Sequence, residues 1–479
     1  MQSTHHRFPV VFLLFGLCLT WFVLSFVGAC STPTVGSENS TETSSPTPDS
    51  GTHSENGIEP NTPDVSPSEP APEPSPEPNP EPAPAEEVST PEPSPEKRAE
   101  PVVPEKPAVP EQSGGDGPVL CPKVQTTAVP KQLGLDPFYQ QYFNSGGIPI
   151  IASGKVPKEA FAQAHYVLAN MLKGQDCIRK AIALSGIRIG ILARSEVTTH
   201  LPEYKDLNKA FPGTDWDKRA RGLGATLVRP LTSGATENLL AERSDRWFGE
   251  SIFLHEFAHS FFEFGIRSVK GGLQKDADLR KLYADAMKAG LWKRTYAATN
   301  AAEYWAETVQ SWFNNNLEAN PPNGVHGPVN TRKELETYDP KMAKFIAGFF
   351  DPKPWPAYCS YKGSGQTWID PTPKDPMAAK CEFDRVFLKN IGCDKEKNVP
   401  KPESKTKGTL IIVNRTYNEQ YTSWWINSQG KRVRYGTIAP RRQWSISSFY
   451  THSWVVTNKA GKCVGLYTLT NPENVVAYE

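Results

Sequence analysis

The chain has 479 residues with 52 Lys and Arg against 52 Asp and Glu, so its formal net charge is +0. Residues 31–118 nevertheless carry −15 and residues 119–479 carry +14, because 15 Glu and 3 Asp face only three basic residues in the first of these parts. That part also holds 22 of the 45 prolines and no Phe, Trp, Tyr or Leu, whereas the roughly 360 residues beyond it are rich in aromatic residues and suit two domains. The two compositions together exclude a single-domain chain and a wholly disordered one.

The chain opens with an apolar run over residues 10–27 that follows Arg7. A positive charge before such a run is typical of an export signal. The run ends in VGAC at residues 27–30, which resembles the lipobox of bacterial lipoproteins. The resemblance implies that residues 1–30 are a lipoprotein signal peptide and that Cys30 carries fatty-acyl chains such as palmitate. The alternative is an uncleaved membrane helix, since about 18 apolar residues can cross a bilayer.

Residues 31–118 follow as an acidic, proline-rich segment. They contain nothing apolar enough to offset an ordering entropy of roughly 1–2 kcal/mol per residue, so we expect this segment to be disordered. Its Pro-Glu repeats favour extended polyproline II. We therefore predict a tether that holds an exported body, periplasmic or at the cell surface, away from the lipid that anchors it to a bacterial membrane.

Six cysteines lie beyond the predicted tether. An even number of cysteines in an exported protein predicts disulfide bonds, although the sequence does not choose among the pairings. No C-x-x-C pair is present, which disfavours a zinc–cysteine site. The six are Cys121, Cys177, Cys359, Cys381, Cys393 and Cys463.

Residues 119–400 mix helical and strand patterns, which predicts an α+β domain. Residues 148–151 and 187–192 are short apolar runs of the kind that form buried strands, and residues 157–172 have helical spacing. Residues 251–259, SIFLHEFAH, also have the spacing of a helix with an apolar face.

Two histidines in that helix can bind one metal ion. His255 and His259 are four residues apart and share a helix face, while Glu256 lies beside them, where a carboxylate can polarise a water molecule. The next strong helical pattern supplies Glu303 and Glu307. One can be the third ligand and the other can accept the free N–H of a bound histidine, and the spacing does not rank them. The alternatives are buried core histidines and a solvated glutamate face.

The string YAATNAAEYWAE at residues 296–307 resembles the corresponding segment of the anthrax lethal factor catalytic domain. The resemblance implies a zincin-like fold over residues 130–350, with Glu303 as the third zinc ligand and Tyr296 stabilising the oxyanion. Glu307 then takes the supporting role. For Tyr296 the alternative is plain packing.

VNTRKEL at residues 329–335 and YDP at residues 338–340 resemble segments of secreted bacterial and fungal relatives of the same group. The T-x-x-E pattern is a capping box and D-P a helix start, so two further helices without catalytic residues are predicted. His165, His200 and His326 are not expected to be ligands.

Residues 405–479 change to short alternating runs separated by turns, which predicts a small all-β sandwich. This module holds 10 basic and 3 acidic residues, half of the +14. The predicted strands are residues 409–414, 421–426, 431–435, 444–448, 453–457 and 463–468.

The module is similar to the von Hippel–Lindau tumour suppressor β-domain, without a gap from residue 425 to residue 454. In that family a tryptophan, a tyrosine, a serine, a histidine and a second tryptophan form a pocket for hydroxyproline in a peptide. Aromatic rings can pack on a pyrrolidine ring, and serine and histidine can bond its hydroxyl. The alternative is core packing. The resemblance implies a site for proline- or hydroxyproline-containing peptides made of Trp425, Tyr435, Ser448, His452 and Trp454.

The sequence thus predicts a surface-tethered, gluzincin-like zinc metallopeptidase with one Zn²⁺ per chain, acting on a protein or peptide, with an accessory peptide-binding module. The alternative is a non-catalytic surface-binding or adhesion lipoprotein that uses the same fold as a scaffold. We favour the enzyme because a scaffold needs neither the HExxH string nor the later glutamate and tyrosine. A nucleic-acid partner is not expected, since the basic charge is dispersed and accompanies no recognised motif.

Overall fold

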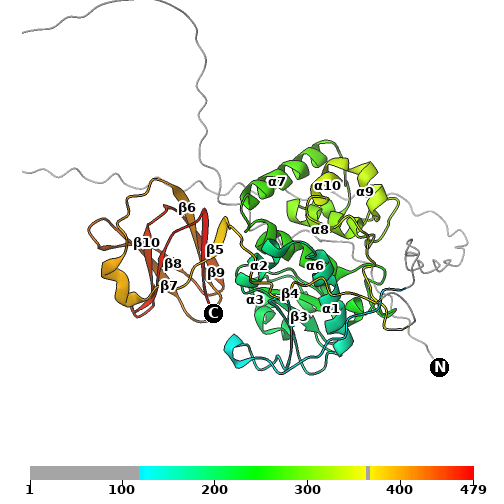
Figure 1. The fold of residues 1–479 in the computed structure, drawn as a ribbon, viewed down its shortest axis with the longest axis horizontal. Coiled ribbons are helices and arrows are strands. Elements are labelled where there is room, and N and C mark those ends of the chain that lie inside the picture. Colours follow the sequence, from blue (N-terminus) through cyan, green and yellow to red (C-terminus); the bar gives the residue numbers. More distant parts are fainter. Residues whose placement is uncertain (1–117, 363–366) are drawn as a thin grey trace, which may run out of the picture. The chain divides into compact units, whose positions relative to one another are not determined.

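The computed structural model describes residues 118–362 and 367–479 (Figure 1). The predicted signal peptide, Cys30 and the predicted tether up to residue 117 lie outside the described residues. Within the described ranges, no helix combines the length and apolarity needed to cross a membrane. The described chain mixes helices and sheets and ends in a β-rich region, which confirms the α+β class predicted from the sequence.

A four-stranded sheet in the order β1-β2-β3-β4 organises the α+β region. Strands β1 and β2 are antiparallel, whereas β2, β3 and β4 are parallel. Neighbouring residues in β2 belong to different cores, since Ile150 packs with one buried cluster and Ile151 with another. Burial on both faces explains why β2 and β3 read as continuous apolar runs. The strands are β1 (Gln141–Ser145), β2 (Ile148–Ala152), β3 (Arg188–Leu192) and β4 (Leu231–Ala235).

Helices pack around this sheet, and the two whose limits were predicted from spacing, at residues 157–172 and 251–259, lie within two residues of those limits. Thr331 and Glu334 form the predicted capping box, and Asp339 caps the last helix. The helices are α1 (Lys158–Met171), α2 (Asp176–Leu184), α3 (Leu207–Ala210), α4 (Trp216–Arg219), α5 (Thr236–Leu239), α6 (Ile252–Ser260), α7 (Gly272–Lys288), α8 (Ala301–Trp312), α9 (Arg332–Tyr338) and α10 (Pro340–Ile346).

The six cysteines beyond the predicted tether form three disulfide bonds, as their even number predicted. Two of them tie the segment after α10 back to earlier parts of the α+β region, and the third lies near the end of the chain. The pairs are Cys121–Cys359, Cys177–Cys381 and Cys393–Cys463.

The C-terminal β region contains two four-stranded sheets, in the orders β11-β10-β7-β8 and β5-β12-β6-β9, which share one apolar core. All six predicted strands are present, but β5 and β12 were missed. Strand β5 has three residues and precedes the predicted domain boundary at residues 400–405, so its pattern was too short to detect. The strands are β5 (Arg385–Phe387), β6 (Lys407–Asn414), β7 (Tyr421–Ile426), β8 (Arg432–Ile438), β9 (Arg442–Phe449), β10 (Ser453–Asn458), β11 (Cys463–Thr468) and β12 (Glu473–Tyr478).

The β5-β12-β6-β9 sheet packs against the α+β region. Leu410 and Ile412 face the core shared by the two sheets, whereas Ile411 and Val413 join the main core of the α+β region. A buried ion pair adds to this contact, because the Arg385 guanidinium bonds Glu263 at 2.9 Å and Glu473 at 2.8 Å. Glu263 belongs to η4 (Phe261–Ile266), the π-helical turn that directly follows α6.

We expect Arg385→Met to lower the free energy of unfolding by about 2–3 kcal/mol, because it removes charge-assisted hydrogen bonds to Glu263 and Glu473, while Arg267 still pairs with both carboxylates. Lys270→Met is the matched control. Its partner is Glu382 and both side chains are exposed, so its loss should cost less than about 1 kcal/mol. Denaturant unfolding of the whole chain measures both variants, and equal losses would contradict the prediction.

Candidate metal centre

Helix α6 presents the HExxH residues from a rigid support. Ser251 caps the helix, its hydroxyl accepting a hydrogen bond from the Leu254 N–H at 3.2 Å. Phe253 and Phe257 are fully buried on the opposite side of the helix from the histidines. His255 is buried and His259 half-buried, so the helix is anchored by its apolar face while the second histidine keeps access to solvent.

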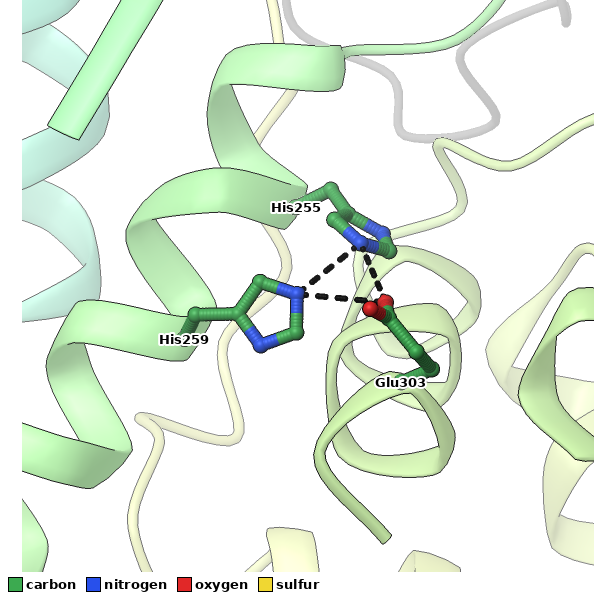
Figure 2. Close-up of side chains that lie close together, drawn as sticks. All are labelled: His255, His259 and Glu303. Atoms are coloured by element: carbon green, nitrogen blue, oxygen red, sulfur yellow. Dashed lines mark hydrogen bonds and ion pairs between the residues drawn. The ribbon is translucent and has the colours of Figure 1, made fainter. Parts of the chain in front are cut away.

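Helix α8 brings Glu303 to the two histidines (Figure 2). Asn300 caps α8 and accepts bonds from the Ala302 and Glu303 N–H groups, which fixes Glu303 in the first turn. Glu303 Oε2 lies 3.1 Å from His255 Nε2 and 3.2 Å from His259 Nε2, and the two Nε2 atoms are 3.1 Å apart. All three predicted ligands therefore converge on one point.

The spacing of these three atoms suits a zinc ion. Tetrahedral zinc with bonds of about 2.0–2.2 Å holds its ligands roughly 3.3–3.5 Å apart, a few tenths of an ångström more than the observed separations. Two imidazole nitrogens and one carboxylate oxygen are also a donor set of catalytic zinc sites, which leave a fourth position for water or substrate. Within the described ranges, no other cluster of His, Cys, Asp and Glu could hold a metal ion.

Residues 222–224, here called the glycine segment, lie close to α6 at the HExxH residues. A Cβ atom at Gly222 would lie 2.8 Å from Ile252 Cγ2 and 3.1 Å from Glu256 Cγ, and one at Gly224 would lie 3.1 Å from His259 Cβ, so glycine allows this close approach without displacing these side chains. Leu223, between them, forms an antiparallel bridge with Ser233 on β4. The segment therefore extends the sheet next to the site. Sequence analysis missed it, although the G-x-G pattern was visible.

Glu256 and Tyr296 neighbour the three candidate ligands, Glu256 as the residue after His255 on α6 and Tyr296 through a contact with Glu303. Burial raises the pKa of Glu256, so its carboxylate takes up a proton more readily than that of an exposed glutamate. Tyr296, in η5 (Tyr296–Ala298), donates a hydrogen bond from its hydroxyl to Glu303 Oε1 at 3.3 Å. Burial also raises the pKa of Tyr296, so its hydroxyl keeps its proton at neutral pH.

Polar side chains contact His255 at Nδ1, the ring nitrogen that faces away from His259 and Glu303. Glu307 Oε1 lies 3.3 Å from His255 Nδ1, where it can accept the free N–H of this histidine, the supporting role expected for the second glutamate. A shorter contact, of 2.8 Å, joins Nδ1 to Gln310 Oε1, and this residue was missed. Gln310 follows Glu303 by seven residues on the same helix, so both lie on one face of α8, two turns apart. That spacing was the signal available in the sequence.

The metal-free cluster retains a proton. Burial opposes charge on His255, but its contacts with Glu303 and Glu307 outweigh burial and raise its pKa well above the ordinary range. For Glu303, burial is likewise outweighed, here by the neighbouring His259 and His255, and its pKa is lowered. A metal ion must therefore displace a proton to bind.

We expect the metal-free protein to lose stability as pH rises. The raised pKa of His255 contributes stability that is complete below its ordinary value of about 6.5 and is lost as pH rises through the folded-state value. Zinc replaces the proton, so the zinc-induced increase in Tm should grow with pH. Thermal unfolding with zinc and with a chelator, at several pH values, tests this. A zinc effect that is constant across pH would contradict it.

The five residues predicted to form a peptide pocket also lie together in the C-terminal β region. Trp425 and Trp454 are opposite each other on β7 and β10. The Tyr435 ring lies 4.8 Å from that of Trp454, and the His452 ring 5.2 Å from that of Trp425. Ser448 Oγ accepts a bond from Trp454 Nε1 at 3.3 Å and lies 3.4 Å from His452 Nδ1.

Their burial is uneven. Trp454 belongs to the core, whereas Tyr435 is 48% exposed, and Trp425 and His452 are half-buried. Trp425 Nε1 is buried and has no hydrogen-bond partner among the described residues. Core packing alone accounts for Trp454 and does not account for an exposed tyrosine beside it.

No protein-family model matches this chain, and no curated protein matches it. One solved structure that it resembles, an NMR structure of a protein from Eubacterium rectale, is 17% identical over 17% of this chain and 85% of that chain, with a TM-score of 0.12. A likeness of this extent carries no argument about function.

Proposed function

We propose that the protein is a zinc-dependent endopeptidase with a zincin-like, gluzincin-type site, similar to the anthrax lethal factor catalytic domain. The observation that carries the proposal is the convergence of His255, His259 and Glu303 within 3.2 Å of one another. Glu256 follows His255 on α6, and the Tyr296 hydroxyl bonds Glu303. A binding scaffold would need none of these five side chains, so the arrangement favours the enzyme over an adhesion protein.

Each residue has a distinct task in amide hydrolysis. His255, His259 and Glu303 would hold the ion, which supplies Lewis-acid polarisation and lowers the pKa of water when bound. Glu256 takes a proton from the attacking water and delivers it to the leaving nitrogen. The Tyr296 hydroxyl donates to the oxyanion that develops on the substrate carbonyl.

The glycine segment supports a peptide as the substrate. Within the described ranges, Gly222 and Gly224 make no backbone hydrogen bond, whereas Leu223 bonds toward β4. Gly222 is buried, whereas Gly224 is half-buried, so the N–H and C=O groups of Gly224 can pair with an extended chain beside Glu256, as in strand addition at a sheet edge.

Chelation and reconstitution test the proposed function. The full chain should cleave peptides in a library, lose this activity with a zinc chelator and regain it with one equivalent of Zn²⁺. His259→Ala should stay inactive after the same addition. Stoichiometric zinc binding without hydrolysis of any library peptide would instead support the scaffold.

We further propose that a lipid on Cys30 anchors the enzyme outside the cytoplasm. Mass analysis of the membrane-extracted protein checks whether Cys30 carries this lipid.

A second function, peptide binding by the C-terminal β region, is favoured by the buried Trp425 Nε1, which has no partner among the described residues, and by the exposed Tyr435 ring that packs on Trp454. Burial lowers the pKa of His452, so at neutral pH its ring is uncharged and can bond a hydroxyl group. We expect hydroxyproline peptides to bind the full chain saturably. In the Trp425→Ala variant of the full chain, this saturable binding should be lost. The full chain is needed because this region packs on the α+β core. No saturable binding of proline or hydroxyproline peptides would remove the proposal.

A further inference from the structure

The buried side chain of Gln310 stands behind His255, on the side away from the metal-facing nitrogen. Gln310 is fully buried, and its Oε1 lies 2.8 Å from His255 Nδ1. Its amide nitrogen faces three oxygens instead, namely Glu250 Oε2 at 3.4 Å, the Ser251 carbonyl at 3.4 Å and the Asn315 carbonyl at 3.5 Å. The two ends of this amide therefore meet different chemistry.

These neighbours decide which way the amide points. A carboxylate and two carbonyl oxygens only accept hydrogen bonds, so the amide N–H groups must face them. Gln310 Oε1 then faces His255, and because a carbonyl oxygen also only accepts, Nδ1 must carry the proton. A neutral His255 is left with its lone pair on Nε2, the atom that points to His259 and Glu303.

We infer that Gln310 is a positioning residue that selects the metal-binding tautomer of His255, and that Glu250 holds Gln310 in this orientation. His326 supports the pair, with its Nε2 3.3 Å from the Glu250 carboxylate. The inference rests on the proposed zinc site and refines it, because the proton on Nδ1 is assigned by a neutral acceptor at 2.8 Å and not primarily by the carboxylate of Glu307 at 3.3 Å.

Zinc affinity of the full chain, measured by competition with a chromophoric chelator, tests the role of Gln310. Gln310→Met keeps the side-chain length and removes the acceptor, so zinc should bind about 10- to 100-fold more weakly. Gln163→Met is the matched control. Gln163 is also buried in a helix, and its amide bonds the backbone of Ala357 and Cys359. This control should lose stability and keep its zinc affinity.

A double exchange separates positioning from packing. In the double variant Gln310→Glu with Glu250→Gln, the donor of the hydrogen bond between these two positions moves to residue 250 and the acceptor to residue 310. Residue 310 still presents an acceptor oxygen to His255 Nδ1. The double variant should therefore bind zinc at least about 10-fold more tightly than Gln310→Met. The absorption bands of bound Co²⁺ should shift in Gln310→Met and recover in the exchange. Unchanged affinity in Gln310→Met, or an exchange no better than it, would overturn the inference. A wild-type chain that binds no zinc would instead overturn the proposed site.

Discussion

Glu256→Gln should lower kcat/KM for peptide hydrolysis by about 10³- to 10⁴-fold, equivalent to roughly 4–5.5 kcal/mol of transition-state stabilisation. The amide matches the carboxylate in size but cannot take a proton from water. Glu256 is not one of the three residues whose ligand atoms converge, which are His255, His259 and Glu303. The amount of zinc bound per chain should therefore be nearly unchanged in this variant. Hydrolysis and zinc content are therefore measured on the same samples.

The control for this variant is Glu318→Gln, which makes the same chemical change at an exposed position. It should retain wild-type hydrolysis. A Glu256→Gln enzyme that holds zinc and cleaves at the wild-type rate would remove Glu256 as the base. Loss of zinc together with activity would show that the residue supports the metal instead.

The local parts of the site were predictable because a helix converts sequence spacing directly into geometry. His255 and His259 lie one turn apart on α6 with Glu256 between them in the sequence, so the shared face of the two histidines follows from a period of 3.6 residues. The N-cap of α8 was not singled out, yet it is equally local, since Asn300 bonds the second and third residues after it.

The remaining parts depend on contacts between residues far apart in the chain. Periodicity alone did not rank Glu303 above Glu307, because the rank depends on how α8 packs against α6. In the structure Glu303 meets both Nε2 atoms, whereas Glu307 meets Nδ1 of His255. The glycine segment and the disulfide pairings are likewise set by tertiary packing, which no single pattern in the chain encodes.

The same limit explains the missed strands of the C-terminal β region. Strand β12 pairs in parallel with β5 and with β6, and residue separations between these strands are large. Parallel pairing leaves no tight turn in the sequence that would announce it. Arg385, on β5, also reads as one more basic residue in a Pro/Lys-rich connector, although it is 2% exposed and joins the two regions.

Tyr296→Phe should reduce kcat by about 10²- to 10³-fold, the usual effect of removing one oxyanion donor. The hydroxyl lies 3.3 Å from Glu303 Oε1, at the edge of the metal position, and the ring lies 6.3 Å from that of His255. Phenylalanine keeps the ring packing and removes only the donor. Zinc affinity and the stability of the fold should therefore change little.

The kinetic pattern distinguishes this role from plain packing. A donor that acts only on the developing oxyanion lowers kcat and kcat/KM equally and leaves KM unchanged, whereas a packing defect that displaces the substrate raises KM. Tyr283→Phe is a suitable control, because Tyr283 also carries a partly buried hydroxyl, which donates a hydrogen bond to the Ala298 carbonyl at 2.8 Å in the same neighbourhood. Equal losses in the two variants would assign Tyr296 to packing and leave the oxyanion to the metal ion alone.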